Sequence, residues 1–276
     1  MPFGAPAECK EMSAPIAITI AGSDSSGGAG IEADLKTFSA LGVYGGAVVT
    51  ALTAQNTKGV FSIHDVPANF IAAQIDAVFA DLDIKAVKIG MLGTAAAIDA
   101  VAAALDRYRP RNVVLDPVMT ASSGDQLLAA NALGRLRELL RRIRVVTPNL
   151  LEAATLLDIL PARDEDEMGA QARKLLELGP GAVLIKGGHG GGPESVDLLV
   201  QGDSCLRLAA PRIPTRNKHG TGCTFASAIA AGLAKGLSLE DAAQEAKTYV
   251  TAAIAGADRL GIGAGRGPVH HFHRWW

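Results

Sequence analysis

Short apolar runs of strand length alternate with longer helical patterns along most of this 276-residue chain, and this alternation restricts its fold more than any other feature. The runs predicted to be strands are Ile16–Ala21, Ala47–Leu52, Ala86–Ile89, Asn112–Leu115, Val145–Thr147 and Ala182–Ile185. The segments predicted to be helices are Ile31–Leu41, Ala68–Phe79, Ala95–Arg107, Asn131–Leu140 and Glu165–Leu178. Strands and helices in alternation form right-handed crossovers, so we expect an α/β protein whose central, mostly parallel sheet carries helices on both faces.

The last third of the chain predicts a hairpin followed by two long helices. The runs Val196–Val200 and Cys205–Ala209 are separated by a short polar turn, as in two antiparallel strands. Helical patterns then cover Gly222–Lys235 and Leu239–Ala255. Since no repeat, charge block or linker divides the sequence, we expect one domain over residues 15–276, preceded by a flexible extension over residues 1–14.

The composition excludes several classes of protein. Hydrophobic residues make up 49% of the chain, and 26 basic side chains against 28 acidic ones give a net charge of −2, so neither disorder nor a nucleic-acid partner is expected. The longest uncharged stretch, residues 37–57, is broken by glycines and by two amides, which argues against a membrane span. The three cysteines, Cys9, Cys205 and Cys223, have no metal-binding spacing and indicate a reducing compartment, so we expect a cytoplasmic protein.

The segment from Thr215 to Thr224 carries the strongest sign of chemistry, because it runs directly into an alanine-rich helix. Gly220 and Gly222 free the backbone there, so the amides at the helix start can form an anion hole at the positive end of the helix dipole. Such a hole suits the charge that develops on a transferred phosphoryl group. Cys223 lies in the first turn, where we expect the pKa of a thiol to fall so that it can act as a base. A small residue that only packs the helix start would fit the same position.

Three other loops that follow predicted strands are rich in glycine and polar residues, and ligands of open α/β sheets sit beyond such strand ends. The first, Gly22–Gly30, precedes Asp34 and either binds an anion or forms a tight strand-to-helix turn. The second, Thr53–Thr57, holds Gln55, whose amide either matches the donor and acceptor edge of an aminopyrimidine or caps nearby backbone. In the third, Met91 either packs against a flat ring or belongs to the core.

Two acidic residues, Asp116 and Glu152, stand just beyond further predicted strand ends. Carboxylates at such equivalent positions favour a Mg²⁺ site, although either acid could instead open a helix. Lys186 also follows a predicted strand, where a lysine can meet a nucleotide phosphate.

Taken together, these segments resemble the hydroxymethylpyrimidine/phosphomethylpyrimidine kinases of thiamine biosynthesis, in the ribokinase-like superfamily. The resemblance lies in AGSDSSGGAGIEADLKTFSALGVYG, TALTAQNTKGV, KIGMLG, LDPVM with SSGD, TPNLLEA, IKGGH, HGTGCT and the tail GPVHHFHRWW, in the family's order from Ile16 to Trp276. It implies a ribokinase-like three-layer sandwich, ATP as co-substrate, Mg²⁺ as cofactor and pairing into a homodimer. The implied activity is transfer of the ATP γ-phosphate to the hydroxymethyl group of 4-amino-5-hydroxymethyl-2-methylpyrimidine, and then to the monophosphate so formed.

The resemblance also implies roles for single residues. The substrate pocket would contain Gly22, Asp34, Gln55 and Met91, with Gln55 as the pyrimidine-binding glutamine. The anion hole would be formed by Gly220, Thr221 and Gly222, with Cys223 standing where many relatives in the superfamily carry an aspartate base. The ATP contacts would come from Asn149, Lys186, Thr215 and Asn217, and the Mg²⁺ ligands would be Asp116 and Glu152.

Some residues depart from the family pattern. Ser25 replaces a proline common in the first loop, Ser122 stands where a lysine often precedes Ser-Gly-Asp, and the glycine run after His189 is peculiar to this chain.

Two alternative functions stay open at this point. A pyridoxal or pyridoxine kinase of the same superfamily would share the anion hole, since its substrate also carries a hydroxymethyl arm on a flat ring. The other alternative is a catalytically silent pyrimidine-binding module. The HHxH tail, with Trp275 and Trp276, fits no common zinc pattern and is expected to pack on the body.

Overall fold

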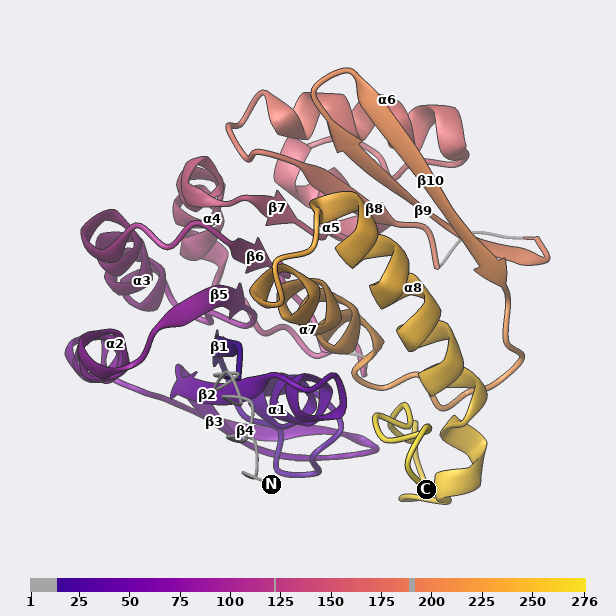
Figure 1. Ribbon diagram of the computed structural model, residues 1–276, viewed down its shortest axis with the longest axis horizontal. Helices are drawn as coiled ribbons and strands as arrows, with labels where there is room; N and C mark the ends of the chain where they lie inside the picture. The colour runs from indigo at the N-terminus through magenta and orange to yellow at the C-terminus, as the bar shows by residue number, and fades with distance from the viewer. Residues whose placement is uncertain (1–13, 122, 189–191) are drawn as a thin grey trace, which may run out of the picture.

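An eight-stranded sheet forms the centre of the molecule (Figure 1). Its strands are β1 (Ile16–Ala21), β2 (Tyr44–Val49), β5 (Ile84–Ile89), β6 (Val113–Leu115), β7 (Val145–Val146), β8 (Val183–Lys186), β9 (Glu194–Gln201) and β10 (Ser204–Pro211). They lie in the order β10-β9-β8-β7-β6-β5-β1-β2, and only the β8–β9 and β9–β10 pairs among them are antiparallel. The mostly parallel sheet and the hairpin near its end confirm the sequence prediction.

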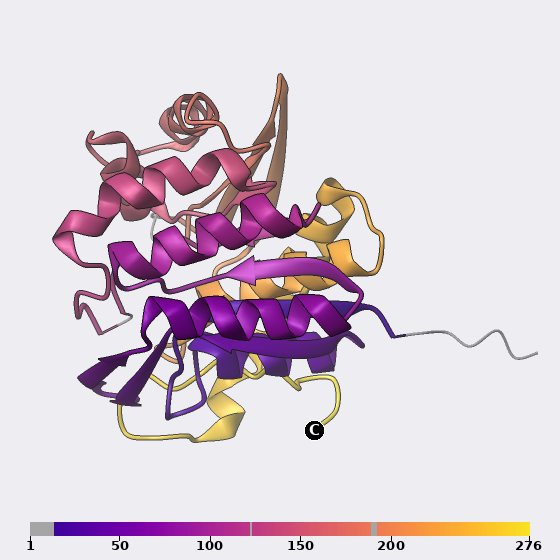
Figure 2. The same ribbon diagram turned by 90° about the vertical axis from the view of Figure 1, so that its left-hand side faces the viewer.

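Helices cover both faces of this sheet, which gives the expected three layers (Figures 1 and 2). One layer contains α1 (Gly30–Ala40), α7 (Thr221–Ala234) and α8 (Leu239–Ala255). The other contains α2 (Ala68–Asp81), α3 (Ala95–Tyr108), α4 (Leu133–Leu139), α5 (Leu150–Leu157) and α6 (Glu165–Leu176). Short 3₁₀ turns cover Ala130–Ala132, Leu140–Arg142 and Ala257–Leu260. The serine of the sequence Ser238-x-x-Asp241 caps α8 by accepting a hydrogen bond from the Asp241 backbone N–H, as the spacing indicates.

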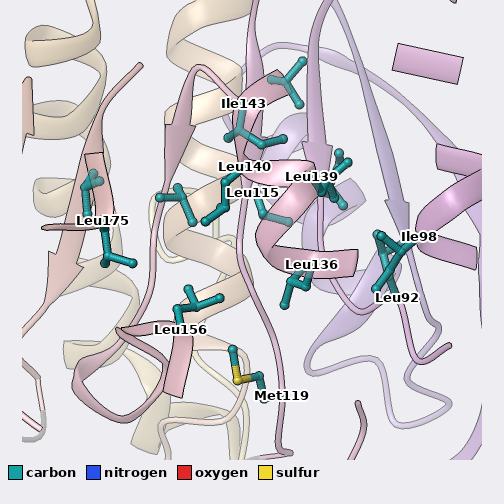
Figure 3. Packing of buried hydrophobic residues seen from close by; sticks show 14 of the residues in the cluster. Leu92, Ile98, Leu115, Met119, Leu136, Leu139, Leu140, Ile143, Leu156 and Leu175 are labelled. Atoms are coloured by element: carbon teal, nitrogen blue, oxygen red, sulfur yellow. The ribbon is translucent and has the colours of Figure 1, made fainter. Parts of the chain in front are cut away.

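The two layers bury separate hydrophobic clusters against the sheet. On one face, leucines and isoleucines of β5, β6 and α3 to α6 pack together, and Leu115, Leu139 and Leu156 are among those drawn in Figure 3. On the other face, α7 is buried from Thr224 to Ala234 between α1, α8 and the sheet. A helix that is apolar on all sides is stable only when it is enclosed in this way. The enclosure fixes where the start of α7 lies relative to the strand ends.

The region after β2 differs from the sequence prediction. The expected strand Ala47–Leu52 is divided, because the chain turns at Thr50, whose Oγ1 donates a hydrogen bond to the Met91 carbonyl oxygen at 2.7 Å. The next residues form β3 (Ala51–Asn56), which pairs with β4 (Gly59–Asp65) in a separate two-stranded antiparallel sheet. The segment expected to be a loop around Gln55 is therefore an edge strand. Because β3 and β4 bury little of their surface, most of their positions can be polar. The sequence of this edge strand therefore has the polar composition of a loop.

The structure describes residues 14–121, 123–188 and 192–276. The expectations for the extension over residues 1–14, for Ser122 and for the start of the glycine run after His189 fall wholly or almost wholly outside this part. Within it, no helix is long and apolar enough to cross a membrane, and no group of three or more His, Cys, Asp or Glu could hold a metal ion. The tail packs on the body as expected at His270 and His271, which are buried, but the expectation is wrong for Trp275 and Trp276, which are about 70% exposed.

Candidate active site

The predicted site residues gather at the carboxyl ends of the parallel strands. The strand order changes direction at β1, which has β2 on one side and β5 on the other. In open α/β sheets a crevice forms at such a point, and the loops after the neighbouring strands line it. Here these loops follow β1, β5 and β6, and the start of α7 packs across the same three strands.

The loop after β1 is organised by one buried carboxylate. Asp24 accepts hydrogen bonds from the backbone N–H groups of Ser26, Gly28 and Ala29 at 2.9, 3.1 and 2.8 Å, and from His219 Nε2 at 2.7 Å. Although burial opposes the charge, these bonds hold the pKa of Asp24 well below its usual range. The loop amides therefore bind a carboxylate of the protein itself. This supports the tight-turn alternative for Gly22–Gly30 rather than an anion cradle.

The same loop approaches the start of α7 so closely that only glycine fits. Gly220, the N-cap of α7, has φ of +79°, and a Cβ on it would lie 1.8 Å from the Gly28 carbonyl oxygen. A Cβ on Gly28 would in turn lie 2.4 Å from Cδ2 of His219. This contact fixes the first turn of α7 against the loop after β1. Sequence analysis singled out the glycines but missed His219, which joins the two loops.

The start of α7 faces an ion pair from two other strands. In the described part of the chain no side chain caps this helix, and Thr221 donates both its hydroxyl, at 2.8 Å, and its backbone N–H, at 3.2 Å, to the Lys218 carbonyl oxygen. A Cβ on Gly222 would lie 3.2 Å from Lys186 Nζ and 3.3 Å from Asp116 Oδ2. The structure thus places an uncapped helix N-terminus beside a lysine and an aspartate, as an anion site of a kinase requires.

A second carboxylate belongs to this group. Lys186 Nζ donates to Asp116 Oδ1 at 2.6 Å, and both side chains are almost fully buried. Burial raises the pKa of Glu152 to about 7. The nearby Asp116 carboxylate raises this pKa further, whereas the Lys186 ammonium lowers it. One oxygen of Glu152 accepts the Asn149 backbone N–H at 2.8 Å, which completes a capping box at the start of α5.

The Asn149 side chain does not face an open cavity. Its Oδ1 accepts hydrogen bonds from the N–H groups of Leu151 and Glu152, both at 2.9 Å. This oxygen therefore caps α5, and the expected contact of Asn149 with ATP stays a prediction. The isolated β-bridge between Asn149 and Lys186 keeps the two strand ends together. Asn149 thus holds Glu152 and Lys186 near each other.

Three residues of the expected substrate pocket lie near this site. Met91 is almost buried, and its Sδ would be 3.0 Å from a Cβ on Gly22, so these two residues pack against each other. Gln55 projects from β3 and is half-buried. The Ser25 hydroxyl bridges to the Gln55 backbone, donating to its carbonyl oxygen and accepting from its N–H, both at 2.8 Å. The serine that departs from the family pattern thus joins the first loop to β3.

The amide of Gln55 keeps a donor and an acceptor for a ligand. Its Nε2 lies 3.4 Å from His219 Nε2, but that nitrogen is 2.7 Å from the Asp24 carboxylate and donates there. Its Oε1 lies 3.3 Å from the Thr53 hydroxyl, which has a closer acceptor in the Ser23 carbonyl oxygen at 2.9 Å. Gln55 also borders a cavity of about 480 Å³ whose rim carries Lys58, Arg216 and Arg266.

A second cavity, of about 560 Å³, lies at the other end of α1 and α7, beside Leu41 and Lys235. None of the predicted site residues is among the described residues that line it. Of the predicted site residues, Gln55 alone is among the described residues that line the cavity of about 480 Å³.

The match to a family of known proteins follows this geometry. Residues 24–270 match the model of the phosphomethylpyrimidine kinase family. The chain belongs to this family. It is 60% identical over 262 residues to the hydroxymethylpyrimidine/phosphomethylpyrimidine kinase of Rhizobium meliloti strain 1021, an alignment that covers 95% of this chain and 98% of that protein.

Solved structures show that the fold of this family is shared with pyridoxal kinases. The phosphomethylpyrimidine kinase of Clostridium difficile 630 has a TM-score of 0.77 and 44% identity, covering 87% of this chain and 99% of that one. The Bacillus subtilis pyridoxal kinase, solved as an ADP complex, has a TM-score of 0.86 and 36% identity, covering 94% and 98%. The ribokinase-like architecture is thus confirmed, while the fold by itself does not separate the two substrates.

Other family residues differ from their expected roles. Asp34 is fully buried, and its carboxylate accepts hydrogen bonds from Lys88 Nζ at 2.7 Å, Thr19 Oγ1 at 2.6 Å and Ser227 Oγ at 2.7 Å. The expectation that Asp34 lines an open pocket therefore does not describe this arrangement. The reason is a buried lysine, Lys88, that sequence analysis did not single out and that requires a counter-ion.

The charge state expected of Cys223 is also wrong. Burial, only partly offset by Lys88, raises the pKa of the Cys223 thiol to about 11. The expectation of a lowered pKa considered only the helix dipole, whereas removal of water from the sulfur has the larger effect here. In this state the residue is a thiol at neutral pH.

Thr215 and Asn217 bind protein groups instead of an open ATP site. The Thr215 hydroxyl and the Asn217 amide both donate to Asp258, and Asn217 Oδ1 accepts the Gly267 N–H at 2.9 Å. These bonds attach the C-terminal segment to the loop before α7. The segment continues along the same loop, where the His219 N–H donates to the Gly267 carbonyl oxygen at 3.1 Å and the Val269 N–H donates to the His219 carbonyl oxygen at 3.2 Å.

Proposed function

We propose that this chain is a kinase that phosphorylates 4-amino-5-hydroxymethyl-2-methylpyrimidine with ATP, and then phosphorylates the monophosphate to the diphosphate for thiamine biosynthesis. The substrate assignment is supported by 60% identity to a relative named for both activities. The observation that carries the chemistry is the packing of Gly222, at the uncapped start of α7, against Asp116 and Lys186. Eight of the strands between Ile16 and Pro211 lie in one sheet, which supports a single kinase domain over residues 15–276.

The arrangement suits phosphoryl transfer because each part of the reaction has a group to meet it. The acceptor hydroxyl oxygen forms a bond to the γ-phosphorus, the bond from phosphorus to the bridging oxygen breaks, and ADP leaves with that electron pair. Amides at Gly222 and Cys223 and the Lys186 ammonium face the charge that spreads over the phosphoryl oxygens. The hydroxyl proton passes to the thiolate form of Cys223, a small fraction of the enzyme at neutral pH, and the thiol so formed returns the proton to water.

We propose Asp116 and Glu152 as the residues that hold Mg²⁺. The donor set fits, because Mg²⁺ in such enzymes takes one or two carboxylates and completes its shell with water and phosphate oxygens. The pKa of Glu152, raised to about 7 by burial and by Asp116, indicates a pair of carboxylates that lacks enough positive charge, which a cation would supply. When bound, the metal would neutralise the ATP phosphates.

The first test separates the proposed function from the alternatives. Purified protein is incubated with Mg-ATP and the hydroxymethylpyrimidine or pyridoxal, and the products are separated by mass. We expect the pyrimidine monophosphate followed by the diphosphate. Phosphorylated pyridoxal alone would keep the phosphoryl-transfer site and overturn the ring assignment, and ligand binding without ATP consumption would favour the silent binding module.

Two substitutions separate ring binding from chemistry. Cys223→Ala should lower kcat far more than it weakens pyrimidine binding, because the sulfur acts on the reacting hydroxyl. Gln55→Ala should instead weaken pyrimidine binding, since its amide carries the donor and acceptor that face the ring. Wild-type turnover in the cysteine variant, or an unchanged Kd in the glutamine variant, would contradict the respective role. Calorimetry and steady-state kinetics give the two readouts.

Pyridoxal is the second candidate substrate, because two pyridoxal kinases, from Bacillus subtilis and Staphylococcus aureus, match this fold with TM-scores of 0.86 and 0.87. Their identity to this chain is 36% and 32%, well below that of the pyrimidine kinases. We propose pyridoxal as a side substrate only, to be measured in the same assay. The cytoplasmic location stays a prediction from the cysteine usage.

We propose that two copies of the chain pair through the apolar surface of β2 and the β3–β4 hairpin. Tyr44, Leu52 and Phe61 on these strands are 59%, 51% and 68% exposed. Exposed aromatic and aliphatic side chains on edge strands favour association. Light scattering should give the mass of a dimer for the wild type and that of a monomer for Phe61→Glu. A monomeric wild type would refute the pairing.

A further inference from the structure

A buried lysine that the reaction scheme does not use lies beneath the start of α7. Lys88 has no solvent exposure, although it stands near the carboxyl end of β5, between Thr19 of β1 and Val114 of β6. Its ammonium reaches toward the strand ends, since a Cβ on Gly90 would lie 2.7 Å from Nζ. Removing a cation from water is costly, so such a residue is retained where its charge has a use.

The charge is held in place by a network that reaches α7. Asp34 accepts Lys88 Nζ and Thr19 Oγ1 at one oxygen and Ser227 Oγ at the other, at 2.7, 2.6 and 2.7 Å. Ser227 is one helical turn beyond Cys223, so it lies on the same side of α7. The network thus joins β1, β5 and α1 to α7. It fixes the Lys88 ammonium on the side of α7 that carries Cys223.

Lys88 remains charged in this position. Burial favours the neutral amine, but Asp34, helped by Cys223 and Asp116, overrides that effect and raises the pKa of Lys88 above its ordinary value. The ionisable groups that act on the Cys223 sulfur are two cations, Lys88 and Lys186, and two carboxylates, Asp34 and Asp116. Lys186 is hydrogen-bonded to Asp116, one of the proposed metal ligands. Lys88 is therefore the one of these two cations that is not bonded to a proposed metal ligand.

We propose that Lys88 is a positioning residue of the kinase, a fixed buried charge that acts through Cys223 by stabilising the thiolate form of its side chain, which is the form that accepts the proton of the acceptor hydroxyl. The proposal rests on the proposed role of Cys223 as base, but it concerns the thiol itself and can be tested without turnover. Asp34 holds Lys88 in place and at the same time opposes its effect on the sulfur, because it carries the opposite charge.

The test measures alkylation of Cys223 by iodoacetamide between pH 7 and 11, because only the thiolate reacts. Peptide mass spectrometry follows Cys223 and, in the same molecule, the exposed Cys205 as an internal reference. We expect Lys88→Met to slow Cys223 alkylation at pH 9 about tenfold or more relative to Cys205, which corresponds to a rise of about one pKa unit. Asp34→Asn leaves Lys88 without its counter-ion, so burial should favour the neutral amine and Cys223 alkylation should slow in this variant too.

Slower alkylation in both variants is the decisive result, because damage to packing alone would loosen the start of α7, expose the sulfur and speed the reaction. Faster alkylation in either variant, or an unchanged profile in Lys88→Met, would overturn the proposal. The double variant Lys88→Met/Asp34→Asn loses the whole pair, leaves no uncompensated charge and is the one most able to fold. It should still react more slowly than the wild type, because Lys88 acts more strongly on the sulfur than Asp34 does. Equal or faster reaction would refute the role of Lys88 even if the single variants do not fold.

The test separates failure of this proposal from failure of the proposed function. If Lys88→Met changes the thiol profile but the wild type phosphorylates no pyrimidine, the electrostatic role stands and the substrate assignment fails. If the enzyme is active and the pH dependence of its kcat is the same in the wild type and Lys88→Met, the lysine has no part in the reaction.

Discussion

Replacing Gly220 by alanine should stop the reaction more than it harms the fold. An alanine here is strained in two ways, because φ is +79° and because its Cβ would lie 1.8 Å from the Gly28 carbonyl oxygen. The left-handed backbone costs roughly 1–2 kcal/mol for an L-residue. To relieve the overlap, the loop after β1 and the start of α7 must separate by more than about 1 Å, since real Cβ atoms essentially never come within 3.0 Å.

That separation moves the amides of the anion hole away from the phosphoryl group. A misplacement of about 1 Å in an active site typically costs about 100-fold in rate, so we expect kcat to fall about that much. The free energy of unfolding should fall by about 2–4 kcal/mol, from the backbone strain and the forced repacking. Urea denaturation gives the stability, and the product-resolved assay gives kcat at saturating substrates.

Gly236 supplies a matched control. It follows the other end of α7 with φ of +88°, and a Cβ on it meets nothing within 4 Å. Gly236→Ala should therefore lose roughly 1–2 kcal/mol of stability from the backbone strain while kcat stays that of the wild type. The reasoning fails if Gly220→Ala keeps kcat within threefold of the wild type, or if Gly236→Ala loses as much activity as Gly220→Ala.

Three further predictions test other parts of the site. Asn149→Ala removes the α5 cap and should lower the free energy of unfolding by about 1 kcal/mol in urea titrations; no change would contradict the capping role. Lys186→Met should raise the KM for ATP about tenfold or more, since a charged hydrogen bond contributes about 1.5–3 kcal/mol; an unchanged KM would remove it from the nucleotide site. Burial lowers the pKa of His271 from 6.5 to about 3, so the unfolded chain takes up a proton first as the pH falls. Stability should therefore decrease below pH 6.5 by up to about 1.4 kcal/mol per pH unit, and His271→Gln should lack this component in urea titrations at pH 6.5 and 4.5.

The strands, the helices and the place of the glycine-rich start of α7 could be predicted because their signals are local. Apolar runs of strand length gave β1 and β5 to β8 to within a few residues, and α8 begins and ends at the residues expected. The Gly220–Gly222 start of α7 could be predicted because glycines before an alanine-rich helix have few other uses. The β3–β4 hairpin and α5 were missed, since a half-exposed edge strand and an eight-residue helix leave a weak pattern.

The sequence by itself therefore determined the layers, the strand ends and which residues stand at them. Only the tertiary structure decided their charge and access, because these depend on neighbours far away along the chain. Asp34 is withdrawn from the pocket by Lys88, 54 residues away, and by Ser227, 193 residues away. Cys223 has the dipole that its position predicts, yet the removal of water raises the pKa of its thiol, since burial of a charge outweighs a partial charge at a helix end.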